Sequence, residues 1–75
     1  MANAVITIDD EPVVINLPAS SYDLMIAAGV DPEKHYVQRV IRGKAGYAYR
    51  VKHEIMAIHN NDQFVTVYTG ATTNG

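Results

Sequence analysis

Two short apolar segments rich in β-branched residues open the chain, and each contains one polar residue between apolar neighbours, Thr7 and Asn16 respectively. They span residues 4–8 and 13–17, and the acidic, proline-containing segment 9–12 separates them. β-Branched side chains favour strands, whereas Asp and Pro favour turns, so the pattern predicts a β-hairpin. Because successive side chains of a strand point to opposite faces, one face of this hairpin is apolar. The predicted inward residues are Ile6, Ile8, Val13, Ile15 and Leu17.

A short helix is predicted next, over residues 22–28. Ser20 or Ser21 can cap its first turn, and Asp23 follows Ser20 at the spacing of a capping box. Gly29 is suited to end the helix in the left-handed conformation. A narrow apolar stripe on this helix can cover the apolar face of the hairpin. The stripe consists of Leu24, Met25 and Ala28.

The second half of the chain predicts more strands. After a proline-containing loop, residues 36–42 form a third strand, the glycine-bounded segment 43–46 a turn, and residues 47–51 a short fourth strand. Residues 54–58 are apolar without alternating, which fits either a helical turn or a short extended segment. The last and most hydrophobic strand spans residues 64–68.

Length and composition restrict the class of protein. Seventy-five residues, 48% of them hydrophobic, allow one small globular domain. No apolar run is long enough to cross a membrane, and the first ten residues lack the basic region of a signal peptide. The absence of cysteine excludes disulfides, thiol nucleophiles and thiolate ligands. These features predict a soluble, cytoplasmic protein without a membrane partner.

Charge and motif patterns argue against nucleic-acid binding, metal binding and catalysis. The net charge is −2, and the basic residues are scattered over residues 34–52 instead of forming a cationic stripe. The histidines lack the i, i+4 spacing of a helical metal pair. They are His35, His53 and His59. The adjacent acids of residues 9–11 fit a solvated turn, and the segment 43–46 lacks the continuation of a phosphate-binding loop. The chain is therefore predicted to be no enzyme and to hold no metal or cofactor.

The predicted order is strand, strand, helix, strand, short strand, strand. With short connections and one helix covering one apolar sheet face, this order favours an α+β fold of the β-grasp type, with a mixed four- to five-stranded sheet. The chain resembles the ubiquitin-like family, and especially its bacterial multiubiquitin-like group. The similarity lies in the hairpin segment 6–12, the helix segment 23–29 and the entry to the last strand at 61–64. It predicts a ubiquitin-like domain over residues 1–69 and a C-terminal tail over residues 70–75.

The resemblance implies that the chain is a bacterial protein modifier that acts through its terminal carboxylate. An adenylating (activating) enzyme would use ATP to activate Gly75, and a conjugating enzyme would transfer the acyl group to an amine of a protein target. A deconjugating metallopeptidase would reverse the reaction, and such systems are associated with anti-phage defence. Glycine suits a narrow catalytic channel because it has no Cβ. The tail that would supply reach consists of small residues. They are Gly70, Ala71, Thr72, Thr73 and Asn74.

The terminal dipeptide departs from the family's usual pair of glycines. Here Asn74 precedes Gly75. Asn-Gly also favours a type I′ turn, so an end at Gly75 is also compatible with a cut through a loop of a longer or tandem protein. A sulfur carrier, which would also activate a terminal glycine, is a further alternative with the same departure from the usual ending.

A non-covalent interaction module, or a self-assembling subunit that uses its sheet surface, is the main alternative. Tyrosine suits interfaces because its ring is apolar and its tip is polar, although packing at sheet edges also explains strand tyrosines. The candidate partner-binding residues are Arg39, Ile41 and Tyr68. If Val40 faces the helix, Ile41 faces solvent; in the opposite register Ile41 belongs to the core. Exposed edges of the sheet are a second route to a homo-oligomer.

Overall fold

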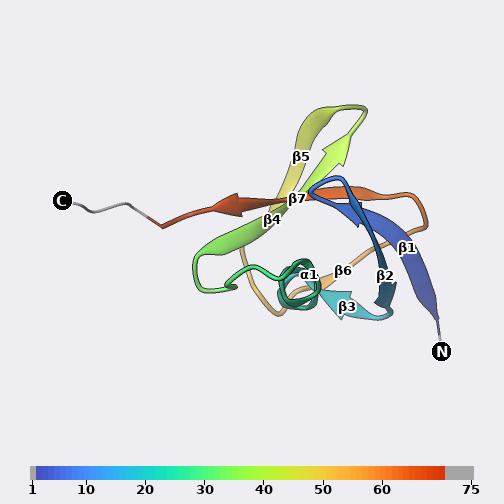
Figure 1. Ribbon diagram of the computed structural model, residues 1–75, viewed down its shortest axis with the longest axis horizontal. Helices are drawn as coiled ribbons and strands as arrows, with labels where there is room; N and C mark the ends of the chain where they lie inside the picture. The colour runs from blue at the N-terminus through green and yellow to red at the C-terminus, as the bar shows by residue number, and fades with distance from the viewer. Residues whose placement is uncertain (1, 71–75) are drawn as a thin grey trace.

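A computed structural model describes residues 2–70 of the chain and contains one α-helix and seven strands over that range. Figure 1 shows the helix packed beneath a twisted sheet, with the β4–β5 hairpin projecting on the side away from the helix. The elements are, in order, β1 (Asn3–Ile8), β2 (Glu11–Asn16), β3 (Ala19–Ser20), α1 (Ser21–Ala28), β4 (His35–Ile41), β5 (Lys44–Tyr49), β6 (Ile55–Met56) and β7 (Gln63–Tyr68).

Five of these strands form one mixed sheet in the order β2-β1-β7-β4-β5. The first and last strands of the chain, β1 and β7, lie side by side and run parallel, whereas the other neighbouring pairs are antiparallel. The short strands β3 and β6 pair separately. One helix on a mixed five-stranded sheet is a β-grasp-like α+β fold, as the order of elements predicted.

The first hairpin has a tighter turn than the predicted segment 9–12. Only Asp9 and Asp10 form the turn, with φ of 53° and 66°, and Ile8 already pairs with Glu11. Two positive φ angles match the twist of the flanking strands, and Asp tolerates this conformation. Pro12 belongs to β2, where its missing N–H lies on the free edge of the sheet. The prediction that Glu11 and Pro12 lie in the turn is therefore wrong.

The helix starts at Ser21, one residue before its predicted start, and the first of the two predicted caps is the one used. Ser20 is the N-cap; its side chain accepts from the Asp23 backbone N–H, while the Asp23 carboxylate accepts from the Ser20 N–H. Gly29 ends the helix at φ 77°, where a residue with a Cβ would be strained. Leu24 and Met25 are completely buried beneath the sheet.

The β4–β5 hairpin differs from its prediction for the same reason as the first hairpin. Its turn consists of Arg42 and Gly43 alone, both with positive φ, so β5 starts at Lys44. The prediction therefore placed both the turn, at 43–46, and the following strand, at 47–51, too far towards the C-terminus compared with the structure. The segment around Ile55 is a short extended strand, which decides between the two alternatives left open by its sequence.

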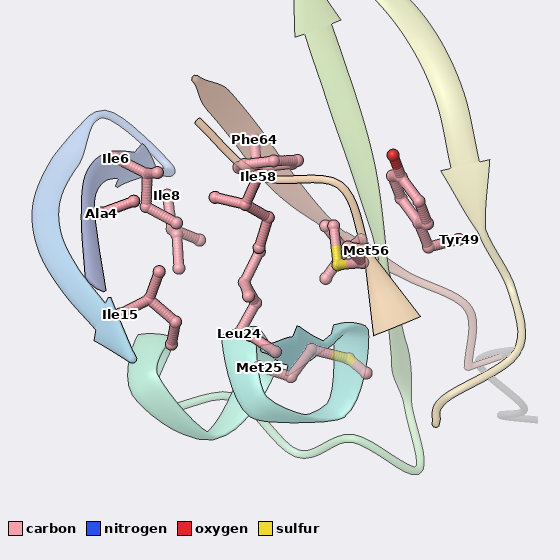
Figure 2. Close-up of a cluster of buried hydrophobic side chains, with 12 residues drawn as sticks. Ala4, Ile6, Ile8, Ile15, Leu24, Met25, Tyr49, Met56, Ile58 and Phe64 are labelled. Atoms are coloured by element: carbon pink, nitrogen blue, oxygen red, sulfur yellow. The ribbon is translucent and has the colours of Figure 1, made fainter. Parts of the chain in front are cut away.

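The core lies between the helix and the sheet face above it. Figure 2 shows Leu24 of the helix pointing towards Ile58 and Phe64, whereas Met25 extends to the side on which Met56 and Tyr49 lie. The predicted inward residues of the first hairpin are all buried or half-buried. Among residues 2–70, every buried side-chain nitrogen or oxygen atom has a hydrogen-bond partner. None of the helical structure described here has the length and apolar character required to cross a membrane.

Candidate functional site

The predicted conjugation residue Gly75 and the tail residues Ala71, Thr72, Thr73 and Asn74 lie outside the described residues. The structure does describe the point from which they follow. Strand β7 lies in the centre of the sheet and ends beside the start of β4, where the chain leaves the sheet (Figure 1). The Thr69 N–H donates to the Lys34 carbonyl oxygen over 2.7 Å, which ties the chain to the folded body directly after β7.

Gly70 and Tyr68 are in direct contact at this exit. A Cβ on Gly70 would lie 2.5 Å from the Tyr68 hydroxyl oxygen, so a larger residue there requires the tyrosine ring to move. The ring also meets His35 edge-on, with ring centroids 5.4 Å apart. Tyr68 remains 56% exposed. The predicted tail residue Gly70 and the predicted partner residue Tyr68 therefore form one surface where the chain leaves the sheet.

Arg39 lies in an internal network instead of on an open surface. Its Nη1 atom is 2.9 Å from Asp62 Oδ2, its Nε donates to the Tyr49 hydroxyl over 3.2 Å, and its Nη2 donates to the Ala57 carbonyl oxygen. The guanidinium also stacks on the Phe64 ring, 4.8 Å from its centroid. These contacts hold the loop between β6 and β7 against the sheet.

The charge of Arg39 is stabilised by these partners. Desolvation by burial acts to lower the pKa of Arg39, but hydrogen bonds to Asp62 and Tyr49 act in the opposite direction and leave the pKa raised above its ordinary value. With only 18% of its side chain exposed, Arg39 has little guanidinium surface left for a partner. Its predicted partner-binding role remains a prediction.

Ile41 lies at the other end of β4 from Tyr68. Tyr68 pairs with His35 at the start of β4, whereas Ile41 pairs with Lys44 at its end. Six residues of extended strand separate the two sites by about 20 Å. Ile41 is 52% exposed, although alternation from the buried Val37 places it on the helix side of the sheet. The end of the β4–β5 hairpin reaches past the helix, so Ile41 is on the helix side of the sheet and is still exposed. The position therefore matches neither predicted alternative completely, that is, Ile41 on the solvent side or Ile41 in the core.

The outer sheet face, opposite the helix, carries a group of valines that the sequence analysis did not propose as a site. Val5 and Val14 are 48% and 64% exposed and lie directly opposite each other on β1 and β2. Tyr36 and Val67 pair on the same face, and Arg50 stacks on the Tyr36 ring at 4.1 Å. The alternation of the first hairpin identified the residues facing the core, and its complement would have revealed Val14.

An open groove of about 350 Å³ lies between β2 and the helix. It follows the free edge of the sheet, because β2 pairs with β1 alone within residues 2–70. Its apolar walls include Ile15, Ile26 and Ala27, and Ile26 is 53% exposed. The remaining lining residues are Val14, Asn16, Pro18 and Asp23. The groove thus combines apolar side chains with the unpaired backbone edge of a strand.

Metal ligands do not gather within residues 2–70. No group of three or more His, Cys, Asp or Glu side chains in that range is placed to hold an ion. His53 and His59 are exposed, and His35 is half-buried with its Nδ1 atom 2.9 Å from the Asp31 carbonyl oxygen.

The fold and these surfaces define a small β-grasp-like α+β protein with two free sheet edges. Comparison of the chain with protein-family models, with curated proteins and with solved structures finds no match.

Proposed function

We propose that the chain is a bacterial ubiquitin-like modifier whose terminal glycine, Gly75, is adenylated and then joined to an amine of a protein target. The observation that carries the proposal is the position of β7. It is the central strand of a β-grasp-like sheet, and the chain leaves it at a fixed point, where Thr69 is bonded to Lys34. On this proposal, the end of β7 is the rigid base from which an activating enzyme would receive Gly75.

The exposed surface at this exit supports the same proposal. Tyr68 offers an apolar ring and a hydroxyl beside the point where the tail follows, and Gly70 lies against that ring. Aromatic residues of this kind are common at protein contacts because they combine apolar area with a polar tip. An activating enzyme that binds here would be positioned next to the residues leading to Gly75. The partners of this function are the activating and conjugating enzymes, a deconjugating metallopeptidase and the target protein, in an anti-phage system.

The experiment is incubation of the chain with a candidate adenylating enzyme and ATP, followed by intact-mass measurement for an adenylate or a thioester. Deletion of Gly75 is expected to abolish the adduct, because the terminal carboxylate then belongs to Asn74, whose Cβ does not suit a narrow catalytic channel. Tyr68→Ala is expected to weaken adduct formation while leaving the fold intact, because this side chain is more than half exposed. Val5→Ala is the matched control, since Val5 is similarly exposed but lies on another strand. An adduct that persists after deletion of Gly75 would contradict the proposal.

A second candidate function is a non-covalent interaction module or self-assembling subunit that uses its sheet. The observation that favours it is that β2 and β5 both lie at free edges of the sheet and carry exposed apolar side chains. Contact through these surfaces would not require Gly75, so a binding or association measurement on the Gly75-deleted chain separates the two candidates.

A further inference from the structure

The two free edges of the sheet have complementary directions. β2 is antiparallel to β1, β1 is parallel to β7, and both β7–β4 and β4–β5 are antiparallel, so β2 and β5 run in opposite directions. If a second copy is placed beside the first in the same orientation, β5 of one copy meets β2 of the next as an antiparallel pair. The helices of both copies then lie on the same side of the continuous sheet.

The backbone groups of the two edges are available for this pairing. The Leu17 N–H donates to the Ala2 carbonyl oxygen, and alternation from this pair directs the backbone groups of Val14 away from β1. On the other side of the sheet, the Thr69 bond to Lys34 fixes which residues of β4 face β7. The alternate residues of β4, including Val37, direct their backbone groups towards β5. Val37 pairs with Tyr49, so the backbone groups of Tyr49 point towards β4. The next residue along β5, Ala48, therefore directs its N–H and carbonyl away from β4, towards the free edge.

Pairing Ala48 of one copy with Val14 of the next also matches the side chains. In this register Tyr47 lies opposite Ile15 of the next copy, on the helix side of the sheet. That is where the groove between β2 and the helix opens, with Ile26 exposed in its wall. Tyr47 is 58% exposed, and its ring is held edge-on against Tyr49 at 4.7 Å between centroids. A preorganised aromatic side chain on one edge thus faces an apolar groove on the other.

The segments of the chain that contain the two edge strands carry opposite charges. All acidic residues except Glu54 and Asp62 lie within residues 9–33, which contain no Lys or Arg. All lysines and arginines lie within residues 34–52. The β2 edge is therefore acidic at its hairpin end, and the β5 edge is flanked by basic side chains. Opposite charges on two meeting surfaces favour encounter in one orientation, and like charges oppose pairing of two β2 edges or two β5 edges.

We propose that the chain self-associates head to tail, with the β5 edge of one copy pairing with the β2 edge of the next and Tyr47 entering the groove beneath Ile15. This contact joins two different surfaces, so it leaves a free edge at each end and extends into an open chain of subunits. Pro12 lacks an N–H on the β2 edge, and a bulge interrupts the β4–β5 register between Gln38 and Val40. These features confine the pairing to a short segment, and the association is accordingly weak and dependent on concentration.

The test is complementation between two proline variants, measured by sedimentation velocity across a dilution series. Val14→Pro blocks the β2 edge and Ala48→Pro blocks the β5 edge, and in each case the lost N–H points out of the fold. Each variant alone is expected to remain monomeric. An equimolar mixture is expected to form a heterodimer and nothing larger, because each partner keeps one working edge. The wild-type chain is expected to form larger species that dissociate on dilution and in high salt.

Amide NMR spectra of each variant establish that it is folded. If a proline variant fails to fold, Tyr47→Asp and Ile26→Asp give the same complementation through side chains that are already exposed. Val67→Ser, on the outer face of the central strand β7, is the control and is expected to associate as the wild type does. The proposal is overturned if the wild-type chain stays monomeric throughout, if either folded variant still forms larger species, or if the folded variants fail to form a heterodimer. The measurement requires no activating enzyme, so its failure is distinct from failure of the proposed modifier function.

Discussion

Removing the Asp62 carboxylate should destabilise the fold far more than removing an exposed carboxylate with a shorter ion pair. Asp62 bonds to Arg39 over 2.9 Å and accepts from the His59 backbone N–H over 2.9 Å. Glu33 bonds to Lys52 over 2.7 Å. Distance alone would rank the Glu33 pair higher. The exposed fractions reverse that order, because 22% of the Asp62 side chain and 76% of the Glu33 side chain are exposed to solvent.

The magnitude follows from what each variant leaves behind. Asp62→Ala removes a charge-assisted hydrogen bond and a neutral one, worth about 1.5–3 and about 1 kcal/mol respectively, and leaves Arg39 without its main anion. Partial exposure of both side chains reduces the sum to about 2–3 kcal/mol. Asp62→Asn keeps neutral hydrogen bonds and should lower the free energy of unfolding by about half as much as Asp62→Ala. Glu33→Ala should lose about 0.5 kcal/mol or less, since solvent already screens that pair.

Urea unfolding followed by circular dichroism measures these differences directly. A domain of this size has a total unfolding free energy of roughly 4–11 kcal/mol, so Asp62→Ala removes a large part of it and lowers the Tm by about 10–20 °C. The raised pKa of Arg39 means that its charge is present at all pH values below its ordinary pKa and is lost only as pH rises through the higher folded value. Equal losses in Asp62→Ala and Glu33→Ala would refute the reasoning that burial, and not distance, determines the contribution.

Four further substitutions test the packing and the turns. Ile6→Ala should cost about 3 kcal/mol in urea unfolding because Ile6 is 1% exposed, whereas Val5→Ala, at 48% exposed, should cost less than about 1 kcal/mol; similar losses would contradict the assigned register. Asp9→Ala should cost about 1–2 kcal/mol because the Asp9 carboxylate accepts from both the backbone N–H and the hydroxyl of Thr66, and an unchanged urea midpoint would count against this contact. Gly29→Ala should lower the Tm, since Ala at φ 77° is strained, and a raised Tm would show that the helix ends differently.

Local patterns predicted the elements whose physics is local. The capping box at Ser20 and the left-handed Gly29 depend on residues within one helical turn, so the sequence alone located the end of the helix and placed its start within one residue. The alternation of the first hairpin placed Ile6 and Ile8 in the core for a similar reason, because every second residue of a strand shares a face. These agreements made the β-grasp order of elements predictable before any pairing was known.

The two tight turns were misplaced because the sequence signal was spread over more residues than the turns use. Asp9–Asp10 and Arg42–Gly43 each need two consecutive positive φ angles, which aspartate and arginine adopt less readily than glycine. Pro12 was read as part of a turn, although at a sheet edge its missing N–H costs nothing. The burial of Arg39 depends on Asp62, a residue distant in the chain, so no local pattern could indicate it.

Detection of a covalent bond from Gly75 to another protein tests the proposed modifier function most directly. The chain, carrying an N-terminal affinity tag, would be produced with candidate activating and conjugating enzymes, and the purified adducts would be digested with trypsin. The last Lys or Arg before the carboxyl end is Lys52, so a conjugated target lysine is expected to carry the peptide from His53 to Gly75 through an isopeptide bond. That branched peptide, absent when Gly75 is deleted, is the result the account predicts. Recovery of only unmodified C-terminal peptide, with enzymes active on another substrate, would contradict it.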